Sequence, residues 1–175
     1  MTVLRRRCLW LKAARAINGT WKLNVAKSTY NPGPGPKSQT LVISGTDAAR
    51  KIAVDLALAN GDAVHWEVSG GAGAQLPVVG TNANADHYVF KRVNATTLEA
   101  QYSGKVSRRS SKQAVVSADG KTLTVTGTGT DAQGRTVNNV AVYDSRMRAW
   151  LTGDRSARHL CSQSGHETLL AFRRR

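Results

Sequence analysis

Apolar and polar residues alternate with a period of two along most of the chain between residues 19 and 143. In KIAVDLALA, residues 51–59, every second residue is a larger apolar one, beginning with Ile52. This alternation is typical of a β-strand that buries one face, and no 3.6-residue period interrupts it. The pattern therefore predicts about nine short strands and an all-β fold.

Turn motifs separate the predicted strands. Asn60-Gly61 and Asp119-Gly120 are dipeptides typical of two-residue hairpins. The tetrapeptide GTDA occurs at residues 45–48 and again at 129–132, each time between two strands, which indicates shared turn chemistry. Residues 70–86 are rich in Gly, Ala and Asn, and a loop with one short strand at Val78-Val79 is expected there. Consecutive hairpins of this kind predict an antiparallel, up-and-down sheet.

An open sheet of consecutive hairpins would leave two unpaired edges, which promote aggregation. We therefore expect the sheet to close into a single barrel of about eight to ten strands, with a two-sheet sandwich as the alternative. The side chains expected to point inward are Leu56, Trp66, Val68, Tyr88, Phe90, Leu98, Tyr102, Leu123, Val125 and Val142.

The first strand opens with a tryptophan and is followed by a proline-glycine segment, in GTWKLNVAKSTYNPGPGP, residues 19–36. Gly19 would let the backbone approach closely where the barrel closes. Trp21 is broad enough to plug a barrel end, and its indole N–H can reach a carbonyl there. Because each proline fixes its own φ, residues 32–36 are expected to form a stiff strap that leads to the second strand without pairing.

The Gly-x-Trp opening resembles that of the calycins, which include the lipocalins and the fatty-acid-binding proteins. The motifs GTWKLN..KS.Y.PGP and GTDAQG…NNVAVY look more closely like a group of bacterial lipocalin-like proteins of unassigned function, over roughly residues 18–144. The resemblance implies a lipocalin-like barrel closed at one end by Gly19 and Trp21, in an exported, periplasmic or extracellular protein. Calycins often stack an arginine of the last strand on this tryptophan, but Arg146 and Arg148 lie just past that strand.

The charge divides the chain into three parts. Of the formal net charge of +14, ten units lie in residues 1–17 and 145–175, which leaves residues 18–144 only mildly basic. We interpret residues 1–17 as a basic flank, a remnant of an export signal whose apolar run is interrupted by Lys12 and Arg15. Residues 145–175 are expected to be a basic tail that is poorly ordered or partly helical.

No residue pattern typical of catalysis or of metal binding stands out. His65 and Glu67 share a strand face, and Asp86 precedes His87, so an acid–base pair is conceivable, but these positions belong to the outer face. The two cysteines, at 8 and 161, lie in the flanks, and their spacing leaves open whether they pair. We therefore expect a protein that is not an enzyme and has no cofactor and no metal.

The barrel interior is the candidate functional site. Aromatic walls with polar edges would suit a small hydrophobic or amphipathic ligand. One alternative is a filled barrel that acts as a structural or interaction module of the cell envelope. Another is a weak polyanion binder, although nucleic acid is not an expected partner because aromatic residues are not interleaved with the basic ones. A monomer without a transmembrane segment is expected. The candidate ligand-binding residues are Leu56, Trp66, Tyr88, Phe90, Tyr102 and Val125.

Overall fold

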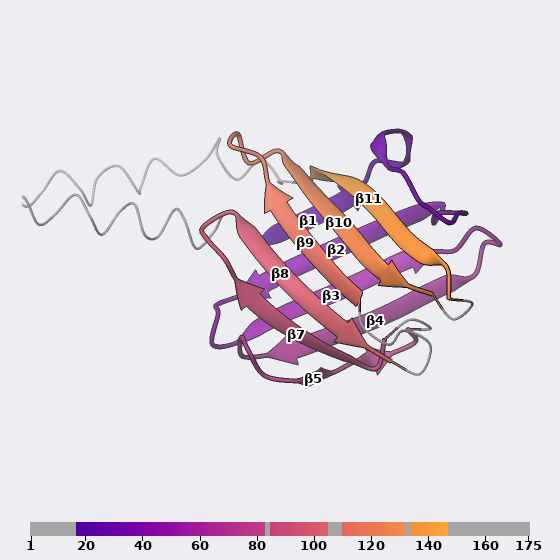
Figure 1. The fold of residues 1–175 in the computed structure, drawn as a ribbon. Helices are drawn as coiled ribbons and strands as arrows, with labels where there is room; N and C mark the ends of the chain where they lie inside the picture. The colour runs from indigo at the N-terminus through magenta and orange to yellow at the C-terminus, as the bar shows by residue number, and fades with distance from the viewer. Residues whose placement is uncertain (1–16, 83–84, 105–109, 132–133, 147–175) are drawn as a thin grey trace, which may run out of the picture.

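The computed structural model describes residues 17–82, 85–104, 110–131 and 134–146, which form one antiparallel sheet of eleven strands (Figure 1). The expected all-β fold is therefore confirmed. Most of both flanks, with Cys8, Cys161 and Arg148, lies outside the described residues. The strands are β1 (Gly19–Leu23), β2 (Ser38–Gly45), β3 (Arg50–Ala57), β4 (Ala63–Gly70), β5 (Leu76–Pro77), β6 (Val79–Gly80), β7 (His87–Arg92), β8 (Thr97–Ser103), β9 (Ser110–Val116), β10 (Thr122–Thr130) and β11 (Thr136–Ser145), and η1 (Val25–Lys27) is a 3-10 turn.

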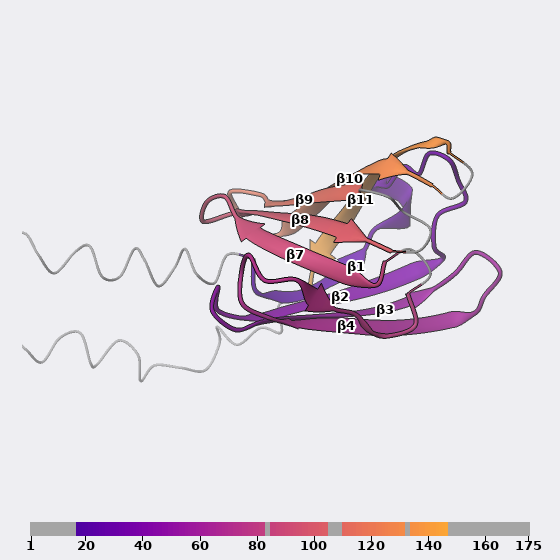
Figure 2. The ribbon, with the colours of Figure 1, turned by 60° about the horizontal axis from the view of Figure 1, so that its bottom comes forward.

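The sheet is up-and-down and rolls into a barrel. Its strand order is β5-β7-β8-β9-β10-β11-β1-β2-β3-β4-β6, so most neighbours in sequence are also neighbours in space. The first strand, β1, pairs with the last strand, β11, on one side and with β2 on the other. Trp21 of β1 lies opposite Ser145 of β11 and Leu41 of β2. Figure 2 shows the consequence, with β7–β10 curving over to lie opposite β2–β4.

A short segment, residues 76–80, spans the gap between β4 and β7. Leu76 in β5 pairs with Tyr88 of β7, and Gly80 in β6 pairs with Trp66 of β4. Between them the Val78 amide donates to the carbonyl of Asp86 at 2.8 Å. The barrel is thus nearly closed. The count of eleven exceeds the expected eight to ten because this segment holds two two-residue strands, too short to produce an alternating pattern.

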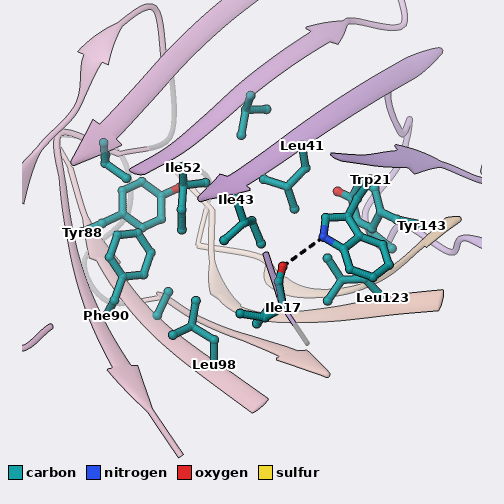
Figure 3. Close-up of a cluster of buried hydrophobic side chains, with 14 of the residues drawn as sticks. Ile17, Trp21, Leu41, Ile43, Ile52, Tyr88, Phe90, Leu98, Leu123 and Tyr143 are labelled. Carbon is teal, nitrogen blue, oxygen red and sulfur yellow. Dashed lines mark hydrogen bonds between the residues drawn. The ribbon is translucent and has the colours of Figure 1, made fainter. Parts of the chain in front are cut away.

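One end of the barrel is filled by a packed core around Trp21 (Figure 3). Trp21 is 2% exposed, and its indole Nε1 donates to the carbonyl of Ile17 at 3.1 Å. Gly19 adopts a φ of +155°, a conformation that few other residues adopt, but a Cβ there would meet only the Trp21 ring, at 3.7 Å. The glycine is therefore needed for its backbone conformation, and the close backbone approach expected at this position is absent.

A buried arginine network lies at the same end. Arg50 is 3% exposed, and its guanidinium donates to the Oδ1 of Asp47 at 2.6 Å and to the Oδ1 of Asn18 at 3.2 Å. Arg92 donates to the same carboxylate at 3.1 Å. Burial would raise the pKa of Asp47, but the hydrogen bonds and charges of the two arginines outweigh it and lower the pKa.

The hairpin turns are longer than the two-residue turns expected. Asn60-Gly61 lies in a five-residue connection between β3 and β4, and Asp119-Gly120 lies in one between β9 and β10. In each, the side chain of the first residue of the dipeptide accepts a backbone N–H two residues on, at 3.0 Å. These local hydrogen bonds stabilise a wider turn, so the dipeptides located the turns correctly but not their length.

The inward face of β11 is the opposite of the one expected. Ala141 and Tyr143 are buried, whereas the Val142 side chain between them points to the outer face and is only half-buried. The sequence NNVAVYD is apolar on both faces, so its alternation does not say which set points inward. The inward placement expected for Val142 was wrong for this reason.

Candidate ligand-binding cavity

The other end of the barrel contains a cavity of about 680 Å³ that is partly open to solvent. Small-molecule sites typically measure roughly 300–1,000 Å³, so the volume suits one small ligand. The lining comes from the strap that precedes β2, from the β3–β4 and β10–β11 hairpins, and from strands β2–β4, β7–β9 and β11. The core at the Trp21 end forms the floor of this space.

Stacked aromatic rings form one wall of the cavity. Tyr88 and Tyr102 lie directly opposite each other on β7 and β8, with ring centroids 5.3 Å apart. Trp66 of β4 stacks on Tyr88 at 5.4 Å with an interplanar angle of 11°. Because β4 and β7 are not adjacent in the sheet, this stack also holds the barrel together across its open seam.

A lysine enters the interior from β9. Lys112 is half-buried and lines the cavity, whereas its neighbours Ser111 and Gln113 are exposed on the outer face. It lies opposite Ala100 of β8 and Gly127 of β10, whose small size leaves room for the long side chain. No carboxylate among the described residues lies within ion-pair distance of its ammonium.

Tyrosines surround the Lys112 ammonium. Its Nζ is 5.0 Å from the ring centroid of Tyr102 and 5.9 Å from that of Tyr88, within the range of cation–π attraction. Burial would lower the pKa of Lys112, but its interactions with the oxygens of Tyr88, Tyr102 and Tyr30 and a hydrogen bond with Tyr88 outweigh this and raise it. The side chain is therefore a cation at neutral pH.

Tyr30 approaches the same region from the segment just before the strap. Its hydroxyl oxygen is buried and has no hydrogen-bond partner among the described residues. The nearby Ser28 hydroxyl already donates to the carbonyl of Asn24 at 2.7 Å and accepts the N–H of Val142 at 3.0 Å. Burial raises the pKa of Tyr30, and the charge of Lys112 and the nearness of Ser28 oppose this. The phenol is therefore neutral at neutral pH, and its O–H has no acceptor among the described residues.

The segment that precedes the strap is paired, whereas no backbone hydrogen bond found among the described residues involves residues 32–36. Thr29 and Val140 exchange two backbone hydrogen bonds, both 2.8 Å, and the N–H of Asn138 donates to the carbonyl of Asn31 at 2.7 Å. Beyond this anchor the prolines at 32, 34 and 36 line the cavity mouth. The pairing of Thr29 and Asn31 with β11 uses backbone groups that follow the end of β1. The alternation of side chains along β1 therefore does not predict it.

Charged and amide side chains complete the lining near the mouth. Asp131 and Arg135 form an ion pair, with Oδ2 and Nε 2.8 Å apart, next to the β10–β11 turn. Asn139 accepts the backbone N–H of Asn31 at 2.9 Å through its Oδ1 and so ties the strap to β11. In both GTDA motifs the aspartate forms an ion pair with an arginine that follows it in the sequence. Arg50 follows Asp47 by three residues, and Arg135 follows Asp131 by four.

The structure places four of the six expected ligand-binding residues in the cavity lining: Leu56, Trp66, Tyr88 and Tyr102. Phe90 and Val125 point inward but do not line the cavity. Phe90 is buried in the core beside Tyr88 (Figure 3), and Val125 packs against that core. Period-two alternation tells which face a residue occupies but not how deep along the barrel axis it lies.

Sequence reasoning missed Tyr30 and Lys112. β9 begins at Ser110, but the residues just before Gln113 are basic and polar and do not show the alternation of a strand. A signal was present, because Lys112 lies two residues before Ala114 and four before Val116 and so falls on the same strand face. A lysine at an inward position breaks the usual polar-out pattern, and for that reason the alternation does not reveal where β9 begins.

The outward polar residues do not form the acid–base pairs considered above. His65 pairs with Asp55 at 2.6 Å across β3 and β4, and Glu67 pairs with Lys51 at 2.7 Å. The His65 and Asp55 side chains are 57% and 63% exposed, as expected of a solvated outer face. Among the described residues, no group of three His, Cys, Asp or Glu side chains is positioned to hold a metal ion.

The fold and the site define the class as a nearly closed, eleven-stranded antiparallel β-barrel with a cavity at one end. Comparison with known proteins adds no family, since no protein-family model and no curated protein matches the chain. The part of the chain that the structure describes contains no helix with the length and hydrophobicity of a membrane span.

Proposed function

We propose that this protein is a non-enzymatic, lipocalin-like barrel that binds one small hydrophobic or amphipathic ligand in its interior. The observation that supports this best is the cavity of about 680 Å³ above a closed core. A barrel with one packed end and one hollow end is suited to holding a ligand that enters from the open side. The sequence resemblance to bacterial lipocalin-like proteins supports the same class and an exported protein.

The lining favours an amphipathic ligand. Leu56 and Trp66 offer apolar surface, whereas Tyr88 and Tyr102 carry hydroxyl groups on the same wall. Burial of the apolar part of a ligand against such a wall would contribute roughly 25 cal/mol per Å². The hydroxyl groups would orient its polar part.

A cavity-filling variant tests the proposal. Gln39 lines the cavity on β2 opposite Leu56, and none of the hydrogen bonds found among the described residues uses its side chain. Gln39→Trp should fill part of the space and weaken binding of N-phenyl-1-naphthylamine, a neutral fluorescent probe, by roughly tenfold or more. Gln101→Trp adds the same ring to the exposed face of β8 and should leave probe binding unchanged.

The wild type should bind the probe saturably, with one-to-one stoichiometry. Circular dichroism and thermal melting of both variants would show that each is folded. If the wild type binds no fatty acid, retinoid or aromatic dye saturably, the carrier proposal is wrong and a structural or interaction module is the better description.

A further inference from the structure

The cavity carries an unbalanced positive charge. The charged side chains among the described residues of its lining are Lys112, Asp131 and Arg135. Asp131 and Arg135 compensate each other through their 2.8 Å ion pair. Lys112 therefore leaves a net charge of +1 among the described residues of the lining. Removing a charge from bulk water is unfavourable unless a counter-charge or hydrogen-bond partners replace the water.

The surrounding tyrosines hold the Lys112 ammonium in place without neutralising it. The rings of Tyr102 and Tyr88 attract it by their faces, at 5.0 and 5.9 Å. An ammonium has three N–H donors, and its interaction with the Tyr88 oxygen uses at most one of them. Donors therefore remain for a further acceptor within the cavity.

A second donor of the same kind lies close by. The Tyr30 hydroxyl is buried and without a hydrogen-bond partner among the described residues, and Lys112 and Tyr30 are close enough to interact electrostatically. Lys112 on β9 and Tyr30 just before the strap thus place an N–H⁺ and an O–H in one region. An acidic group has several acceptor oxygens and no donor, so it is the chemical complement of this pair.

We propose that the ligand of this barrel is an organic anion, with its acidic group held by Lys112 and Tyr30 and its apolar body against Leu56 and Trp66. The inference rests on the proposed function and specifies the class of ligand. The negative charge of such a ligand explains why a lysine occupies an inward position on a strand, where an apolar residue would be usual. An alcohol or amine of the same size would leave the charge uncompensated.

Two fluorescent probes that share one aromatic skeleton and differ by a single sulfonate group distinguish the effect of ligand charge from that of ligand shape. 8-Anilinonaphthalene-1-sulfonate carries one negative charge, and N-phenyl-1-naphthylamine is the same aromatic body without it. Lys112→Met keeps a long apolar side chain and removes the cation. We expect it to weaken binding of the sulfonate by roughly tenfold or more, the effect of one charge-assisted contact, and to change binding of the neutral probe less than twofold.

Matched variants control for indirect effects. Lys91→Met removes a lysine from the exposed face of β7 and should change neither affinity. Lys112→Arg should retain most of the sulfonate binding, and Tyr30→Phe should weaken it by several-fold without affecting the neutral probe. Decanoate should displace the neutral probe from the wild type at lower concentration than decanol does, which extends the preference to carboxylates.

The outcomes distinguish this inference from the proposed function. If the neutral probe binds and Lys112→Met leaves sulfonate affinity unchanged, the anion inference is wrong while the carrier function stands. If neither probe binds the wild type, the proposed function itself fails. An equal loss of both probes in Lys112→Met, with an unchanged melting temperature, would assign Lys112 a role in cavity shape and would also overturn the inference.

Discussion

The two tryptophans among the described residues are used differently at the two ends of the barrel. Trp21 is enclosed by core side chains, and its N–H is satisfied by the Ile17 carbonyl. Trp66 is 8% exposed and lies where the core meets the cavity, with one ring face stacked on Tyr88. The same residue type therefore closes the barrel at one end and lines a site at the other.

Buried tyrosines predict how stability depends on alkaline pH. Burial raises the pKa of Tyr143 well above its ordinary value, and nearby Tyr30 raises it further. In the unfolded chain this phenol ionises near pH 10, whereas in the folded protein it keeps its proton. The unfolded state therefore loses protons that the folded state retains, so the free energy of unfolding should fall as pH rises above about 10.

Tyr143→Phe tests this dependence. Removing one such phenol should make the decline less steep, by up to about 1.4 kcal/mol per pH unit. Urea unfolding of wild type and variant at pH 8 and at several values above about pH 10 would measure it. Parallel stability curves for the two proteins would show that Tyr143 does not contribute.

At the scale of elements, the seam between β4 and β7 depends on a close approach of β6. Gly80 adopts a φ of +100°, and a Cβ at this position would lie 2.5 Å from the carbonyl oxygen of His65 and 3.0 Å from the Cα of Trp66. Both are backbone atoms within a strand and cannot move aside easily. A larger residue would therefore push β6 away from β4.

Gly80→Ala should destabilise the protein by about 1–3 kcal/mol from overpacking and backbone strain. It should also weaken probe binding, because Gly80 lies opposite Trp66 in the cavity wall. Gly73→Ala is the matched control, since Gly73 has a φ of +80° but no atom within 4 Å of its Cβ position. That variant should show only the cost of the backbone conformation. If Gly80→Ala and Gly73→Ala lose the same stability in thermal and chemical unfolding, the close contact at the seam is unimportant.

At the scale of the whole molecule, the described residues close their own core. The ladder between the first and last strands in the sequence, β1 and β11, runs from Leu23 opposite Tyr143 to Trp21 opposite Ser145, and Ile17 adds a further buried side chain. A shortened chain of residues 17–146 should therefore melt within a few degrees of the full-length protein.

Thermal melting of both lengths would measure this, with Ile17→Ala in the shortened chain as a positive control. That substitution removes a buried side chain and should cost about 2–5 kcal/mol, a shift of several degrees. A drop of similar size on truncation alone would mean that a flank packs on the barrel.

The sequence by itself determined the class of fold. Alternation at Ile52 and Val54, and again at Trp66 and Val68, follows from the two-residue period of a strand with one buried face. The positions of the turns were readable because Asn60 and Asp119 make local hydrogen bonds that need no distant partner. These are short-range properties of the chain, and a barrel is the economical closure for them.

Only the tertiary structure decided where the barrel is hollow. Leu56 and Phe90 both alternate inward, yet one lines the cavity and the other fills the core, because depth along the axis depends on the stagger between strands. Tyr30 and Lys112 come together from segments about eighty residues apart, through the pairing of residues 29–31 with β11 and of β9 with β10. A local pattern carries no information about such long-range registers, so the site was set by the way the sheet closes.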